Sequence, residues 1–232
     1  LGRLARDITR RIAGAAKTVR AAFAKPLDLV TRLLRQRRES RGRDKLYSLH
    51  APEVECIGKG KAQARYEFGC KVSVATTNAA APGGQFVLGV RALPGNPYDG
   101  HTLAEQLAQV TRITGVQIGR AYVDRGYRGH DADKTRVVIS GQRRGITPTI
   151  RREMRRRSAI EPVIGHLKAD GHLGRNFLAG TQGDAINLVL AAAGHNLRLL
   201  RAWLLSLLAF LLASIVTAPR QPIRCTAAPA PA

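Results

Sequence analysis

Cysteine, methionine and tryptophan are scarce in this sequence of 232 residues. The three cysteines, Cys56, Cys70 and Cys225, are an odd number, and their spacing forms neither a disulfide framework nor a CxxC zinc pair. The opening stretch LGRLARDITRRIAG is charged and lacks the apolar core of a secretory signal. We therefore expect a cytoplasmic protein with reduced thiols.

Acidic residues are also few. The chain has 38 Lys and Arg against 16 Asp and Glu, which gives a formal net charge of +22, and the excess is spread along the chain. Such a charge attracts polyanions and makes their binding depend on salt. The composition indicates a nucleic acid partner, and a solvated basic surface, as in ribosomal proteins, is the alternative.

The periodicity of apolar residues predicts two basic helices and a β-hairpin in the first part of the chain. Residues 1–45 have aliphatic side chains at helical spacing with Arg and Lys between them, and Pro26 is the expected break. Residues 66–77 alternate in polarity, and residues 85–93 repeat this period after a Pro-Gly-Gly turn.

Helices and strands then alternate. We predict a helix over 102–113, strands over 116–123 and 136–140, and a long helix over 150–169. The order strand, strand, helix, strand, strand, helix indicates an α/β fold. A glycine-broken connector over 170–184 leads to a further helix over 185–200.

An uncharged apolar run, AWLLSLLAFLLASIVTA, extends from Ala202 to Ala218. It approaches the length of a membrane span but is slightly short, and Arg198 and Arg201 precede it. A leucine-rich core or subunit-contact helix is the favoured interpretation, and a membrane-anchored basic protein is the alternative. The chain thus divides into a basic helical segment at 1–45, an α/β region at 46–200, the apolar helix at 201–218 and a Pro/Ala tail at 219–232 that we expect to be disordered.

One carboxylate stands where α/β proteins place ligands. Asp124 directly follows the predicted strand over 116–123, within the glycine-rich stretch YVDRGYRG. Sheets of this class bind ligands at the carboxyl ends of their strands, so Asp124 is a candidate site residue. An ordinary loop aspartate that caps the next segment is the structural alternative.

A second carboxylate, Glu161, lies within RRRSAIEPVIGHLKAD. Arg157 precedes it by four residues and Lys168 follows it by seven, so all three fall on one face of the predicted helix. A surface ion pair of small value is one explanation. The other is that Glu161 binds a metal ion while the two cations bind phosphates. Two carboxylates from distant parts of a basic chain, Asp124 and Glu161, suggest phosphoryl transfer with magnesium.

The same residues carry a family resemblance. RSAIEPVIGHLK matches the R(3)E(6)K spacing of bacterial insertion-sequence transposases with a DDE catalytic triad, and YVDRGYRG resembles their second-aspartate motif. The stretches YSLHAPEVECIGKGKA, GNPYDGHTLAEQL and GHLGRNFLAG also resemble one subgroup of these enzymes. The resemblance covers about residues 1–203.

The resemblance implies a ribonuclease H-like mixed sheet flanked by helices over 46–200, and a reaction that cleaves and joins DNA strands with Mg²⁺ or Mn²⁺. Asp124 would be the second metal-binding catalytic carboxylate and Glu161 the third. Arg157 and Lys168 would contact DNA near the scissile phosphate. The partners would be double-stranded DNA at transposon ends and target DNA, the complete protein would be a homo-oligomer, and no membrane partner is expected.

The chain departs from the family pattern at two points. Met154 replaces the tyrosine that stands three residues before the arginine in the four-part YREK motif. No strand carrying the first aspartate is found. Asp99, in the turn NPYDGHT, is the best internal candidate, whereas Asp7, Asp28 and Asp44 lie in helical or linker sequence.

The absent first strand has a structural consequence. That strand is central in a ribonuclease H-like sheet, so its absence predicts a gap between the hairpin at 66–93 and the strands that end at Asp124 and Ser140. Backbone groups on both sides would need other partners. We expect an amino-terminally truncated copy that is poorly folded or inactive alone. The alternative is a catalytically dead remnant that binds DNA through its arginines without cleaving it.

Overall fold

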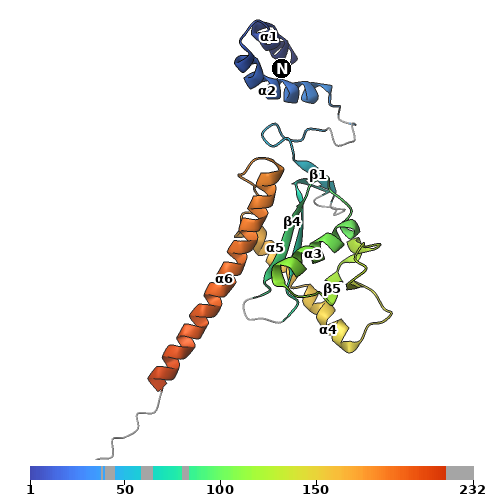
Figure 1. Cartoon of the computed structure of the whole chain (residues 1–232), viewed down its shortest axis with the longest axis vertical. Helices are drawn as coiled ribbons and strands as arrows, with labels where there is room; N and C mark the ends of the chain where they lie inside the picture. Colours follow the sequence, from blue (N-terminus) through green and yellow to red (C-terminus); the bar gives the residue numbers. More distant parts are fainter. Residues whose placement is uncertain (38, 40–44, 59–64, 80–83, 218–232) are drawn as a thin grey trace, which may run out of the picture.

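The computed structural model describes residues 1–37, 39, 45–58, 65–79 and 84–217. Two helices, α1 (Gly2–Ile12) and α2 (Lys17–Arg35), open the chain and pack against each other (Figure 1). Neither has a buried residue, and each carries basic residues in its last turn. The prediction of two basic helices is therefore confirmed.

The break between these helices lies around Gly14 and not at Pro26, which is inside α2. The backbone N–H groups of Ala13 and Ala15 bond to carbonyls three residues earlier, so the helical ladder ends in a tight turn. Pro26 removes one donor from α2, but the residue is exposed, so water can solvate the carbonyl that loses its partner.

The predicted β-hairpin is confirmed by β3 (Lys71–Thr76) and β4 (Val87–Leu93), which pair antiparallel. The first part of the predicted strand separates from β3 as β2 (Tyr66–Gly69), because Gly69 has a φ of +149°, a conformation open mainly to glycine. β2 pairs instead with β1 (Glu55–Gly58), a strand that the sequence pattern did not predict.

A further pair of strands, β5 (Arg120–Val123) and β6 (Arg136–Ile139), is parallel. β5 is shorter than the strand predicted over 116–123, because only residues 120–123 pair with β6. No ladder joins β3–β4 to β5–β6 in the described part of the chain, so the gap predicted between the two pairs is present. The α/β class is confirmed, but the strands form separate two-stranded sheets there.

The helices of the α/β region are α3 (Leu103–Thr114), α4 (Pro148–Arg157), α5 (Ile160–Ala169) and α6 (Gly180–Thr217). α3 confirms the helix predicted over 102–113. It ends at Gly115, whose φ of +67° closes the last turn. Two short 3₁₀ turns, η1 (Asp99–Thr102) and η2 (Arg125–Tyr127), precede α3 and follow β5.

The single helix predicted over 150–169 is wrong, because it is interrupted at Ser158 between α4 and α5. Pro162 has no N–H to donate to the carbonyl of Ser158, and the N–H of Glu161 bonds to that carbonyl instead. Proline is accepted there because it lies in the first turn of a new helix. Arg157 therefore ends one helix and Glu161 lies at the start of the next, so the predicted shared face crosses a break.

β4 is packed on both faces. On one face its valines join side chains of α5 and α6 in a core cluster made of Val87, Val90, Val163, Leu167, Leu188, Ala191 and Ala192. On the other face α3 comes close at Gly89, where a Cβ would lie 2.8 Å from Gln109 Oε1 and 2.9 Å from Val110 Cγ2. A second cluster, of Leu103, Val123 and Ala132, connects α3 to β5. The two strand pairs are thus held together by helices.

α6 is one continuous helix of 38 residues, where the sequence predicted a helix over 185–200 and a separate apolar segment over 201–218. Its first half is fixed to β4. Asn196 Nδ2 donates to the carbonyl of Val87 at 2.8 Å, and Asn196 Oδ1 accepts from the N–H of Val87 at 2.9 Å. The second half of α6 projects away from the other elements (Figure 1). The tail predicted at 219–232 lies outside the described residues.

The core cluster on β4 predicts a position-dependent effect of leucine truncation in α6. Leu188 is 1% exposed and Leu190 is 61% exposed, so the two residues form a matched pair on one helix. We expect Leu188→Ala to lower the free energy of unfolding by about 2–5 kcal/mol through lost burial and a residual cavity. Leu190→Ala is expected to change it by less than about 0.5 kcal/mol. Urea titration followed by circular dichroism measures both, and equal effects would contradict the packing described for α6.

Candidate functional site

Asp124 lies directly after β5, where the chain enters η2. Its Oδ1 accepts a hydrogen bond from the backbone N–H of Gly126 at 2.9 Å, so the carboxylate caps this short turn. The side chain is exposed. The local geometry agrees with the capping alternative considered for this residue, and it also holds the carboxylate in a defined position at the end of a strand.

A second aspartate, Asp99, lies beside it. A Cβ at Gly126 would be 2.9 Å from Asp99 Oδ2 and 3.1 Å from Asp124 Oδ1, so the two carboxylates flank this glycine and these oxygens are no more than about 6 Å apart. Any larger residue at position 126 would displace them. Asp99, which the sequence placed only in a turn, is thus brought to the carboxyl end of β5 by the fold.

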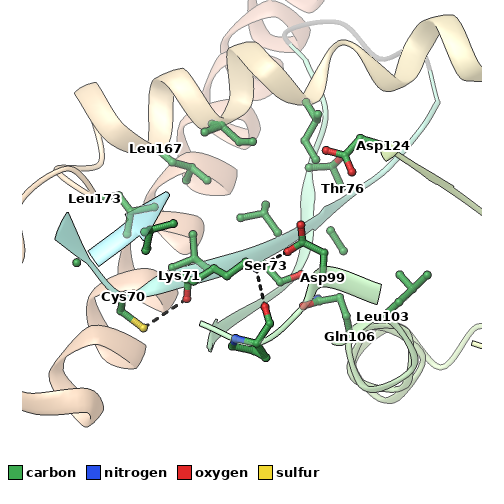
Figure 2. Close-up of a pocket in the computed structure, with 18 of the residues that line it drawn as sticks. Cys70, Lys71, Ser73, Thr76, Asp99, Leu103, Gln106, Asp124, Leu167 and Leu173 are labelled. Carbon is green, nitrogen blue, oxygen red and sulfur yellow. Dashed lines mark hydrogen bonds and ion pairs between the residues drawn. The ribbon is translucent and has the colours of Figure 1, made fainter. Parts of the chain in front are cut away.

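Lys71 of β3 forms an ion pair with Asp99. Its Nζ is 2.7 Å from Asp99 Oδ1 and donates to the carbonyl of Pro97, also at 2.7 Å (Figure 2). The Lys71 side chain is 21% exposed, so its charge is partly shielded from water and offsets that of Asp99 more strongly than a surface pair would. Lys71 was not predicted as a site residue, because its partner lies far along the chain.

These residues line a cleft with a volume of about 1620 Å³. Residues 70–78 and 120–124 line it without interruption. Successive side chains of a strand point to opposite faces, so a cleft lined by every residue of a strand is bordered by the strand's edge. The cleft therefore borders the edges of β3 and β5, and residues of β1, β2, α3, α5 and α6 line other parts of it.

The cations predicted from the sequence also reach this cleft. Arg157, at the end of α4, and Lys168, in the last turn of α5, both line it. Arg157 Nε is buried and has no hydrogen-bond partner among the described residues, which is costly for a charged group. Lys168 Nζ is 3.7 Å from Glu67 Oε2 of β2 in a half-exposed ion pair.

Glu161 is not among the residues that line the cleft. It lies in the first turn of α5 with an exposed side chain, a position in which a carboxylate interacts favourably with the helix dipole. Asp124, Arg157 and Lys168 therefore share one cleft, and Glu161 stands outside it. In the described part of the chain, no three His, Cys, Asp or Glu side chains gather as a metal site.

A carboxylate that was not predicted from the sequence, Glu153 of α4, connects β5 to α4. Glu153 Oε1 is 3.1 Å from Arg120 Nη2, and Glu153 Oε2 accepts a hydrogen bond from the hydroxyl of Tyr122. Burial and this carboxylate raise the pKa of Tyr122. The contact keeps the edge of β5 in place next to the helix that ends at Arg157.

Tyr127, at the end of η2, is the group whose titration reports on the aspartate pair. Burial raises the pKa of Tyr127, and the negative charge of Asp99 raises it further, because a tyrosinate would be repelled. A hydrogen bond with the hydroxyl of Ser73 lowers the same pKa, and Asp124 raises it by a smaller amount. Tyr127 thus contacts β3 across the cleft.

No protein-family model, no curated protein and no solved structure matches the chain.

The charge of Asp99 is expected to be measurable through Tyr127. Asp99→Asn removes a negative charge near the phenol, so the pKa of Tyr127 should fall toward its ordinary value. Absorbance titration of tyrosinate checks this, with Tyr127→Phe used to subtract the other four of the five tyrosines. Asp133→Asn, at an exposed position, is the matched control and should leave the titration unchanged. An unshifted pKa in Asp99→Asn would show that the two groups are not close.

Proposed function

We propose that the chain carries part of the active site of a DNA strand-cleaving and strand-joining enzyme of the DDE transposase type. The observation that carries the proposal is that Asp124, Arg157 and Lys168, singled out from three separated positions in the sequence, line one cleft. A carboxylate and two cations around one cavity suit a phosphodiester substrate, because the cations offset the phosphate charge. The net charge of +22 favours the same polyanionic partner.

The cations are proposed to hold the DNA backbone. Arg157 lines the cleft, and its guanidinium is proposed to donate hydrogen bonds to a phosphate oxygen there. Lys168 is half exposed and its ion pair with Glu67 is long, so a phosphate can compete for it at low cost.

A divalent cation fits part of this site. Magnesium takes oxygen ligands and is often held by only one or two carboxylates together with substrate phosphates and water. Asp124 is proposed as one such ligand. The resemblance implies Glu161 as the other protein carboxylate, but Glu161 lies outside the cleft in this structure. The ion would supply Lewis-acid stabilisation of charge on the phosphate oxygens. In this proposal Lys71 is a positioning residue, because it orients Asp99 beside Asp124 and offsets part of the negative charge.

A catalytically inactive DNA-binding protein is the second candidate. The observation that favours it is the position of Glu161, which is exposed and outside the cleft, while no three-carboxylate group gathers in the described residues. Such a protein would keep the cations and bind DNA without a metal ion.

Nicking of a supercoiled plasmid in Mg²⁺ or Mn²⁺ separates the two candidates. The assay uses this chain and a version extended by the in-frame DNA upstream of Leu1. For the enzyme we expect nicking by the extended version, reduced on the order of a hundredfold or more by Asp124→Ala or Glu161→Ala, because the resemblance implies that each residue binds the metal ion. Asp133→Ala, at an exposed position, is the control. Unchanged nicking by Glu161→Ala would refute its assignment, and DNA binding without nicking by either version would favour the second candidate.

The DNA contact of Lys168 is tested by the salt dependence of binding. Lys168→Gln should lower affinity for duplex DNA about equally for all sequences and reduce the slope of log affinity against log salt by about 1, since one phosphate contact is lost. Fluorescence anisotropy with a labelled duplex measures the slope. The matched control is Lys134→Gln, an exposed lysine outside the cleft, which should leave the slope nearly unchanged. Equal slopes for all three proteins would place Lys168 outside the DNA contact.

A further inference from the structure

The projecting half of α6 is apolar and uncovered. From Ala202 to Ile215 it has no charged residue, and every side chain in this stretch is exposed. The helix is long and apolar enough to cross a membrane, and none of its most apolar window is buried. A core helix of a soluble protein would be mostly buried, so the core-helix interpretation favoured from the sequence does not hold in the described structure.

The distribution of side chains around the helix bears on what could cover it. At 100° per residue, one narrow stripe carries only small residues, namely Ala202, Ser206, Ala209 and Ala213. Large apolar side chains occupy the rest of the circumference, with Leu208 and Phe210 nearly opposite each other. A single partner helix covers a stripe of roughly 100°, so one second copy of the chain would leave most of this surface in water. A lipid phase covers all of it.

The polar groups of this segment are satisfied within the helix. The hydroxyl of Ser206 donates to the carbonyl of Ala202 at 3.0 Å, and that of Ser214 donates to the carbonyl of Phe210 at 2.9 Å. A hydroxyl bonded back to its own helix needs no water molecule as a partner, which is the arrangement required in hydrocarbon.

The boundary of the segment has the features of a membrane interface. Arg198 and Arg201 lie just before the apolar stretch, and Trp203 follows them. Tryptophan is favoured at the level of lipid headgroups, and arginines next to an apolar helix pair with anionic phosphates. From Ala202 to the end of α6 at Thr217 the uncharged part of the helix is about 24 Å long at 1.5 Å per residue, somewhat shorter than the roughly 30 Å of a hydrocarbon core.

We propose that α6 inserts into an anionic lipid bilayer from about Ala202 onward, with Trp203 at the interface and the α/β region outside the membrane. The inference does not depend on the proposed function, because no residue of the cleft belongs to this part of α6. It assigns lipid as the partner of the apolar segment, in place of the subunit contact expected from the sequence.

The full chain offers a direct test, because Trp203 is its single tryptophan. The chain is mixed with vesicles of equal parts phosphatidylcholine and phosphatidylglycerol. We expect the emission of Trp203 to shift to shorter wavelength and the chain to float with the vesicles in a density gradient. Chain that stays in the aqueous fraction with unshifted emission would overturn the proposal.

Substitutions on opposite faces distinguish lipid from a protein partner. Leu208→Arg and Phe210→Arg should each lower vesicle partitioning on the order of a hundredfold, because arginine is costly at any face of an inserted helix. Leu190→Arg, at an exposed position in the first half of α6, is the matched control and should partition like the parent chain.

Two other results would count against insertion. If Leu208→Arg and Phe210→Arg both float as well as the parent, the basic surface alone holds the chain on the membrane. If the emission of Trp203 is already blue-shifted without vesicles, and only one of the two substitutions converts an oligomer to a monomer in sedimentation, a second copy covers one face of α6. Either result would overturn the proposal.

Discussion

The enclosure of β4 is the constraint on which the rest of the structure depends. Its valines pack against α5 and α6 on one face, and Gly89 admits α3 on the other. One edge pairs with β3. Side-chain amides close the far edge, since Asn196 bonds to both backbone groups of Val87, and Gln109 Nε2 donates to the carbonyl of Val90 at 2.9 Å. Because these backbone groups of β4 have hydrogen-bond partners, β4 needs no further strand beside it there, and it holds in place the helices that border the cleft.

The cleft lies beside strand edges that β4 does not cover. Among the described residues, β3 has a strand partner on one edge only and β5 is paired only with β6, so two strand edges face a shared space. The residues at this space are of both charges, with Asp99 and Asp124 at one end of β5 and the cations on β3, α4 and α5. Opposite charges within one cavity suit an anionic substrate that must bind in a defined position. The cations attract the substrate, and the carboxylates repel it from their own positions unless a bound cation bridges the two.

Local structure could be predicted wherever the signal was local. The β3–β4 hairpin and α3 with its terminal Gly115 follow from alternation, helical period and turn chemistry within short windows. Pro162 also indicated the break between α4 and α5. The prediction missed it because the helical period of apolar residues continues on both sides of the proline. The closeness of Asp99 and Asp124 had no local sign, because it depends on how η1 and η2 are packed. The exposure of the second half of α6 could not be predicted either, since a leucine-rich run has the same composition in a protein core, in a subunit contact and in lipid.

Because α6 is continuous, the contact of Asn196 with β4 determines the direction and reach of the projecting half of the helix. A helix without a break does not flex freely at its middle, so the half bound to β4 sets the direction of the half that projects. From Asn196 to Ile215 the axis advances about 28 Å at 1.5 Å per residue. The length and direction of α6 therefore fix the distance between the cleft and any surface that binds the far end of the helix.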